Sequence, residues 1–203
     1  IGAAGIPATA TTFLAIGHFR TSPTIGRGGA TYSTFNYEEF LKNPPSYPGR
    51  EITEDRLWEN IAYFLERAIP VAEEAGVRIS LHPDDPPIPE PLGGAARIGV
   101  SLENYRRIFD LVPSETTGML FCQGCVAEMG ADVCEAIRYM GIRNKIVYVH
   151  FRNIRGSSYN FQEVFIDEGD VDMVKAMETY RDVGFTGPFM KDHKPGITHT
   201  SGA

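Results

Sequence analysis

Apolar and polar positions alternate along the chain in two patterns. Short apolar runs typical of buried strands occur at Ala8–Ile16, Val77–Leu81, Met119–Phe121, Ile146–Arg152 and Pro188–Asp192. Segments with helical periodicity lie between them, at Thr53–Ala75, Ser101 to Leu111, Ala131 to Met140 and Val171–Val183. Strands that alternate with helices across short turns predict a parallel sheet with right-handed crossovers. We therefore predict an α/β fold built on a parallel sheet.

The best-defined helix is Thr53–Ala75. Thr53 can cap its start, because a threonine hydroxyl accepts a hydrogen bond from a free amide of the first turn, and Gly76 is a typical stop. One apolar stripe recurs at helical spacing, so we expect it to face the core. It consists of Leu57, Ile61, Phe64, Leu65, Ala68 and Val71.

Two long segments, Thr21–Arg50 and Asn153–Asp170, show neither pattern and are expected to be loops. The first contains Tyr32, Phe35, Tyr37 and Phe40, and so many aromatic residues favour an ordered, functional loop over a linker. The second ends in acidic residues. Asp167, Glu168 and Asp170 either are solvated or form hydrogen bonds that orient a metal-binding side chain without contacting the metal themselves.

Four of the predicted strands end in a side chain that can bind a metal. These side chains are His82, Cys122, His150 and Asp192. The carboxyl ends of parallel strands share the edge of the sheet at which such folds bind ligands. Singly, each residue has a commoner structural role, such as a buried small hydrophobe for a cysteine or a helix cap for an aspartate. Together they offer nitrogen, sulfur and oxygen donors, which suit Mn²⁺, Fe²⁺, Co²⁺ or Zn²⁺ better than Mg²⁺ or Ca²⁺.

Composition excludes several classes of partner. The 203 residues are enough for one domain, and we expect 1–203 to be a single domain. A net charge of −7 argues against nucleic acid and against an anionic membrane surface. The sequence also has no apolar run near the roughly 20 residues that span a bilayer, and no signal segment.

The three cysteines suggest a reducing compartment. Cys122, Cys125 and Cys134 are an odd number without a disulfide framework, so we expect a cytoplasmic protein. Cys122 and Cys125 form a C-x-x-C pair, which in redox proteins usually opens a helix. Here the first cysteine closes an apolar run, and no second pair is present to complete a zinc knuckle. Redox chemistry and structural zinc are therefore minority hypotheses.

Six stretches resemble, in the same order, the mannonate dehydratase family, whose fold is a xylose-isomerase-like (β/α)8 TIM barrel. They are Gly26–Ser33, His82–Pro86, Cys122–Gly124, His150–Gly156, Asp167–Met173 and Asp192-His193. A closed barrel has eight strands, and this chain has about five, so the resemblance implies an incomplete barrel. The family has further strands before the position of Ile1 and after that of Ala203, and we expect the chain to be part of a longer protein.

The resemblance also implies roles for individual residues. His82, Cys122, His150 and Asp192 match the family's metal ligands, with Mn²⁺ or Fe²⁺ favoured and Co²⁺ or Zn²⁺ as alternatives. His193 matches a catalytic acid or base of the family. A tyrosine that the family uses would fall beyond Ala203. Members are commonly dimers and convert D-mannonate to 2-keto-3-deoxy-D-gluconate in hexuronate breakdown.

Several charged residues have two interpretations. Arg152 matches a residue of the family's substrate site, where it would clamp the substrate carboxylate and assist catalysis, but it could instead neutralise Asp84 or Asp85. Asp84 and Asp85 could bind substrate hydroxyls or hold their proline-rich turn. Arg27, and with it Arg20, could reach the substrate from the long loop, although nothing in the sequence fixes their direction.

Three functional hypotheses remain open. The first is a metal-dependent sugar-acid dehydratase, and the second is a sugar isomerase or epimerase on the same barrel, because fold alone does not choose between them. A second, carboxylate-rich metal site would favour the isomerase. The third is an inactive fragment with open sheet edges. We expect His18 and His199 not to be ligands.

Overall fold

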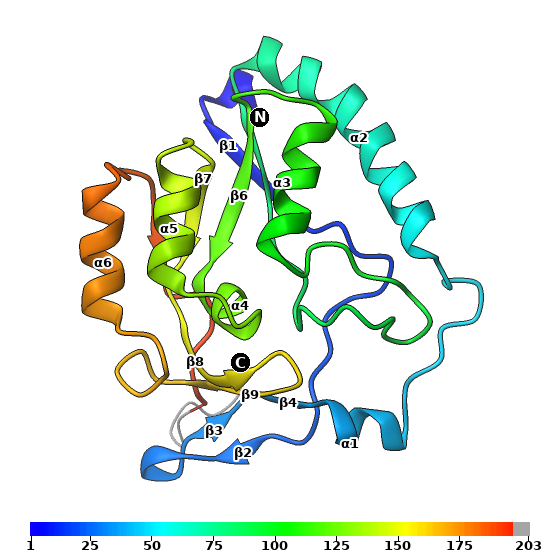
Figure 1. The fold of residues 1–203 in the computed structure, drawn as a ribbon, viewed down its shortest axis with the longest axis vertical. Helices are drawn as coiled ribbons and strands as arrows, with labels where there is room; N and C mark the ends of the chain where they lie inside the picture. Colours follow the sequence, from blue (N-terminus) through cyan, green and yellow to red (C-terminus); the bar gives the residue numbers. More distant parts are fainter. Residues whose placement is uncertain (197–203) are drawn as a thin grey trace.

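The computed structural model describes residues 1–196, so His199 lies outside the described residues. Its centre is a parallel half-barrel sheet of five strands in the order β1-β5-β6-β7-β10 (Figure 1). The strands are β1 (Ala8–Thr11), β5 (Arg78–Leu81), β6 (Thr117–Cys122), β7 (Ile146–His150) and β10 (Phe189–Met190). The prediction of an α/β fold with an incomplete barrel of about five strands is confirmed.

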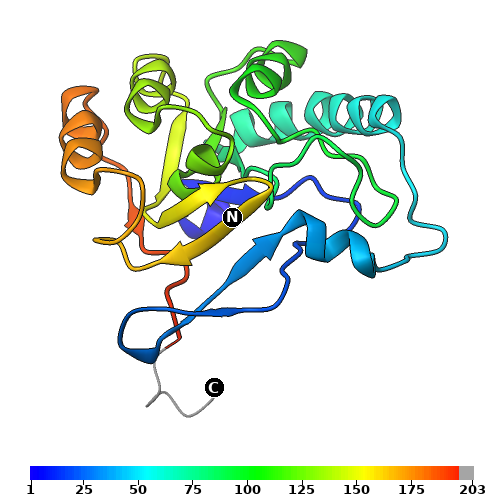
Figure 2. The same cartoon turned by 60° about the horizontal axis from the view of Figure 1, so that its bottom comes forward.

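Four helices cover one face of this sheet, side by side in Figure 2. They are α2 (Glu54–Ala75), α3 (Leu102–Leu111), α5 (Val133–Gly141) and α6 (Met173–Asp182). Their starts follow the expected chemistry, because the Thr53 and Ser101 hydroxyls each accept a hydrogen bond from an amide of the first turn. None of the helices within residues 1–196 has the length and hydropathy that crossing a bilayer requires.

Helices and sheet enclose one large apolar core. Ile61 of α2, Phe121 of β6 and Ile137 of α5 are completely buried in it. The stripe predicted for α2 holds at Leu57, Ile61 and Leu65, but Val71 was predicted wrongly and is exposed. The helix is long, and its buried side moves to Ile69 and Ala72 in the last turns.

Two small antiparallel sheets lie across the carboxyl ends of the parallel strands (Figures 1 and 2). One pairs β2 (Thr24–Ile25) with β3 (Thr31–Tyr32). The other has the order β4-β9-β8, with β4 (Thr34–Asn36), β8 (Asn153–Ser157) and β9 (Asn160–Val164). The remaining elements are α1 (Tyr37–Lys42), α4 (Gln123–Glu128) and the short 3₁₀ turns η1 (Gly2–Ala4) and η2 (Arg27–Gly29).

The expectation that Asn153–Asp170 is a loop was wrong, because residues 153–164 form the β8–β9 hairpin. Its buried face is mixed, with Ile154 and Phe161 beside the buried carboxylate of Glu163. A charged side chain on the inner face breaks the apolar–polar alternation by which a strand is found in a sequence.

The first strand is shorter than predicted. Ala8–Ile16 was expected to be extended throughout, but β1 ends at Thr11, which pairs with Leu81 at the end of β5. Within residues 1–196, no strand pairs with the chain beyond Thr11 in this segment. Ile16 leaves the sheet and packs instead with Phe19 and Phe35 in a second apolar cluster under the small sheets.

Candidate metal centre

The parallel register brings three of the predicted strand-end residues to one level. Cys122 and His150 are paired neighbours on β6 and β7, and His150 pairs on its other side with Met190 of β10. Asp192 follows β10 directly. Because parallel strands end at a common edge, residues far apart in sequence arrive at the same place.

Cys122, His150 and Asp192 form a compact group of donors. One donor atom from each lies within 4.8 Å of the other two. His150 Nδ1 is 3.4 Å from Asp192 Oδ2, and Cys122 Sγ is 4.0 Å from the same oxygen. All three are within reach of a single ion, and they supply the nitrogen, sulfur and oxygen expected from the sequence.

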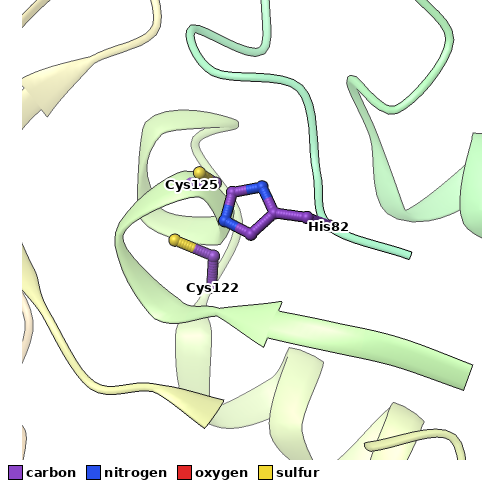
Figure 3. Close-up of side chains that lie close together, drawn as sticks. All are labelled: His82, Cys122 and Cys125. Atoms are coloured by element: carbon purple, nitrogen blue, oxygen red, sulfur yellow. The ribbon is translucent and has the colours of Figure 1, made fainter. Parts of the chain in front are cut away.

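His82 joins this group through the thiol of Cys122. Its imidazole lies beside the sulfur atoms of Cys122 and Cys125, from the loop that follows β5 (Figure 3). The His82 and His150 rings are 5.2 Å apart between centroids. His82 Nδ1 lies 2.6 Å from the Pro83 carbonyl oxygen, which can only accept, so Nδ1 carries the proton and Nε2 is free to bind a metal.

The backbone at Asp192 is strained. Its φ of 62° lies in the left-handed region, which aspartate tolerates better than most residues. This conformation turns the chain immediately after β10. Unusual backbone angles of this kind concentrate at functional sites.

A second observation supports a metal at these donors. His150 Nδ1 is buried and has no hydrogen-bond partner. A buried polar atom without a partner costs roughly 1–3 kcal/mol, and coordination to an ion would remove that cost. Burial lowers the pKa of His150, but the nearby Asp192 carboxylate and Cys122 thiol raise it, to about 9 overall, so a metal would displace a proton there.

The thiol of Cys122 is prepared for binding in the same way. Burial raises its pKa, but a hydrogen bond from Cys125 and the positive charge of Arg152 bring the pKa well below its ordinary value. The thiolate is the form that binds metals.

The donors open onto a cavity of about 970 Å³. Among the predicted site residues, His82, Asp85, His150, Asp192 and His193 line it. The other lining side chains with polar chemistry are Thr11, Thr12, His18, Arg20, Ser33, Tyr148, Glu163 and Lys194. A small polar molecule in the cavity would touch His82, His150, Asp192 and His193 together.

Arg152 lies behind the donors, with only 2% of its surface exposed. Its guanidinium contacts Asp85 at 3.2 Å and Glu128 at 3.0 Å, so the alternative in which it neutralises Asp85 has direct geometric support. Arg152 is not among the residues that line the cavity. Its predicted role as a clamp for a substrate carboxylate stays a prediction.

Asp84 and Arg27 also lie away from the cavity. Asp84 is buried, accepts a hydrogen bond from the Gly99 amide at 3.0 Å and so holds the turn after β5. Burial raises the pKa of Asp84 to about 6. Arg27 is on the surface, where it pairs with Asp167 at 2.9 Å, and Glu168 accepts a hydrogen bond from the Tyr32 hydroxyl. These contacts hold the small sheets, and the substrate roles of both residues stay predictions.

Two carboxylates of the site, Glu163 and Glu128, were missed from the sequence. Glu163, on β9, contacts Arg20 and Arg152 through one carboxylate oxygen and His193 Nδ1 through the other. Arg20 also pairs with Asp85 at 2.7 Å. A buried carboxylate in an apparent loop gives no local sequence signal. The one indication is that Arg20 has no acidic residue near it in the sequence, which implies a carboxylate partner from elsewhere in the chain.

This arrangement, a parallel β/α half-barrel with ligand-type residues after four of its five strands, defines a metal-competent barrel protein. The comparisons identify the family within this class. The chain belongs to the D-mannonate dehydratase (UxuA) family, whose model matches residues 38–201.

Relatives of known name agree with this assignment. Mannonate dehydratase 2 of Halalkalibacterium halodurans is 37% identical over 178 residues, which cover 86% of this chain and 51% of the relative. Mannonate dehydratase of Enterococcus faecalis is 38% identical over 164 residues, covering 79% of this chain and 44% of the relative. The chain thus spans about half the length of the relatives that it matches.

Solved structures give the same result. The crystal structure of mannonate dehydratase from Streptococcus suis serotype 2 superposes with a TM-score of 0.85 at 31% identity, over 97% of this chain and 58% of that one. A D-tagatose 3-epimerase-like protein superposes with a TM-score of 0.52 at 20% identity, over 66% of this chain and 47% of that one, which shows the shared fold alone.

Proposed function

We propose that the protein to which this chain belongs removes water from D-mannonate to give 2-keto-3-deoxy-D-gluconate, as a hydro-lyase of hexuronate breakdown. The observation that carries the proposal is the strand-end donor group of Cys122, His150 and Asp192, with His82 beside it, in a chain of the D-mannonate dehydratase family. The catalytic unit is the single partial barrel domain 1–203.

The four strand-end residues are the proposed metal ligands. Their mixed donor set favours Mn²⁺ or Fe²⁺, with Co²⁺ or Zn²⁺ as alternatives. When bound, such an ion stabilises the negative charge that develops on the substrate as a proton leaves the carbon beside the carboxylate.

We assign the transfer of this proton to His193. Its imidazole lines the cavity and lies one residue after Asp192, with Nδ1 against Glu163 and Nε2 3.3 Å from Asp192 Oδ2. A histidine held at one ring nitrogen presents the other in a defined direction, and it can take and return a proton near neutral pH. The hydroxyl on the next carbon departs as water once it receives a proton.

The charged side chains of the cavity include both signs. Arg20 and Lys194 line it, whereas Asp85, Glu163 and Asp192 contribute negative charge. A divalent cation would shift this balance toward the positive charge that a sugar acid needs. Asp85 is the predicted substrate-binding residue that reaches the cavity, where its carboxylate can accept hydrogen bonds from substrate hydroxyls.

A sugar isomerase or epimerase is the second candidate, and one observation favours it. Asp85, Glu163 and His193 also place donor atoms within 4.8 Å of one another, which could form a second, carboxylate-rich cation site. Arg20 and Arg152 already neutralise both carboxylates, so the dehydratase is the better supported function.

The first experiment is elemental analysis of the purified protein beside its His82→Ala variant. We expect about one Mn, Fe, Co or Zn per chain in the wild type and much less in the variant. The wild type is then supplied with D-mannonate, and formation of a 2-keto acid is followed. Isomerisation of a neutral sugar without keto-acid formation would favour the second candidate, and absence of metal after reconstitution would overturn both.

We also propose a cellular compartment and an oligomeric state for the protein. We expect a cytoplasmic homodimer, since the three cysteines are free and buried and the resemblance implies a dimer. Size-exclusion chromatography and circular dichroism test this against the inactive-fragment hypothesis. A dimer that melts cooperatively supports the proposal, whereas heterogeneous association without a melting transition supports the fragment.

A further inference from the structure

We propose that Arg152 is a positioning residue, which holds Cys122 and Asp192 in place as metal ligands and does not touch the substrate. The inference rests on the proposed metal site and assigns to Arg152 a role different from that of a carboxylate clamp. It follows from the contacts of the guanidinium, from its burial and from the space that the chain leaves for it.

The guanidinium lies directly against the two anionic ligands. Arg152 Nε is 3.3 Å from Cys122 Sγ and 3.1 Å from Asp192 Oδ2. One N–H group therefore lies between a thiolate and a carboxylate that come from β6 and from the end of β10. These two groups repel each other before a metal arrives, and the cation between them offsets that repulsion.

The rest of the guanidinium is held from behind. Its Nη1 lies 3.0 Å from Glu128 and 3.4 Å from Glu163, and its Nη2 lies 3.2 Å from Asp85 and 3.2 Å from Cys125 Sγ. These acceptors come from α4, from β9 and from the turn after β5. Every nitrogen of the guanidinium therefore already has a partner, and none is available for a substrate carboxylate.

The backbone of α4 leaves room for this side chain at Gly124. A Cβ atom at position 124 would lie 2.7 Å from Arg152 Cζ and 2.8 Å from Arg152 Cγ. Any larger residue at position 124 would therefore collide with Arg152, which packs directly on Gly124. The same short stretch supplies a proposed metal ligand and the space for the group that orients this ligand.

Loss of a group that orients a metal ligand typically lowers metal affinity by about 10–100-fold. A clamp for a substrate would have a different effect. Its loss would raise KM for an anionic substrate and leave metal affinity unchanged. The two roles can therefore be separated by measuring metal binding alone.

The test is the Kd for Co²⁺ of the apoprotein, by competition with a chromophoric chelator, in wild type and Arg152→Lys. Lysine keeps the positive charge but has neither the Nε–H group that lies between the two ligands nor the planar fork that fixes it in place. We expect a roughly 10–100-fold weaker Kd and an altered thiolate-to-cobalt absorption band. Arg155→Lys is the matched control, because Arg155 is exposed in the same segment, and it should bind Co²⁺ like the wild type.

A second variant guards against misfolding of the first. Gly124→Ala keeps Arg152 but displaces it, and it should weaken Co²⁺ binding in the same direction while circular dichroism reports an intact fold. Wild-type affinity in both variants would overturn the positioning role and leave the proposed function standing. A wild-type protein that binds no Co²⁺ would overturn the proposed metal site and the inference together.

Discussion

Cys122 is shared by both groups of donors at the strand ends. One group joins it to His150 and Asp192, and the other joins it to His82 and Cys125. A single sulfur atom therefore connects the two histidines that come from β5 and β7. Any ion that uses all four proposed ligands depends on it more than on the others.

Replacing this sulfur tests the ligand role directly. Cys122→Ser should weaken Co²⁺ or Zn²⁺ binding by at least the roughly 10–100-fold that outer partners contribute, because a neutral hydroxyl is a poor substitute for a thiolate. Metal affinity of the apoprotein is the measurement. Cys134→Ser, in α5 and also buried, is the control and should bind normally. Equal metal binding in the two variants would refute the role of Cys122.

His193→Asn should separate chemistry from metal binding. Asparagine keeps a polar side chain of similar size but cannot exchange a proton near neutral pH, so we expect turnover of D-mannonate to fall by about 10²–10⁴-fold. The metal content should stay at the wild-type level. A variant that still forms the keto acid at the wild-type rate would exclude His193 as the acid or base.

For single residues, the sequence predicted which strand-end side chains lie close together, but it did not predict all the charged groups that contact them. The strand-end rule brought His82, Cys122, His150 and Asp192 together, because period-two strands and a common edge leave little freedom. Glu163 and Glu128 were missed. Their only indication in the sequence is an oppositely charged residue far away in the chain. The local pattern of residues does not show which distant charges will pair.

The hairpin of β8 and β9 is the element that completes the site. It carries Glu163 on β9, and the side-chain amide of Asn153, at the start of β8, donates to the Ile166 and Val171 carbonyls in the segment that leads to α6. Gly156, within β8 and opposite Phe161, has a φ of 104°. A Cβ there would lie 2.1 Å from the Asn160 carbonyl oxygen.

Gly156→Ala should loosen this hairpin without unfolding the barrel. We expect a loss of roughly 1–2 kcal/mol from the backbone conformation alone, and more from the clash. Hydrogen exchange should become faster at the β8 and β9 amides and stay unchanged at those of β6. Gly130→Ala is the control, since its φ is 76° but its Cβ meets no atom within 4 Å. Equal protection in the two variants would contradict the assignment.

Elements with regular periodicity were predicted well. The starts of α2 and α3 at Thr53 and Ser101 are confirmed, because caps and apolar stripes are local signals. The short strands of the small sheets were not predicted. They are two to five residues long, which is too short for a clear periodic signal, and β4 pairs with a strand far along the chain, Thr34 with Gln162.

For the molecule as a whole, the proposed ligands link distant parts of the chain. His82 and Asp192 are separated by most of the helical layer, yet they lie at the same edge of the sheet. An ion bound there would connect β5, β6, β7 and β10. Ions that bind the folded state and not the unfolded state raise stability by mass action.

Removal of the metal should therefore lower Tm. With free metal at about 100 times its Kd, the expected stabilisation is about 2.7 kcal/mol. For a chain of this size that corresponds to a shift of roughly 5–10 °C. Thermal unfolding followed by circular dichroism, with and without a chelator, measures the shift. The His82→Ala variant should show a much smaller one, and an equal shift in both proteins would place the stabilising ion elsewhere.

The position of Asp192 at the end of β10 also sets an order of events during synthesis. A ribosome delivers β5, β6 and β7 first, so His82, Cys122 and His150 emerge before the strand that carries their fourth partner. The edge of β7 on which β10 docks is unpaired at that time. Asp192 can join the other three proposed ligands only when β10 docks on that edge, so an ion that uses all four ligands would bind as a late step of maturation.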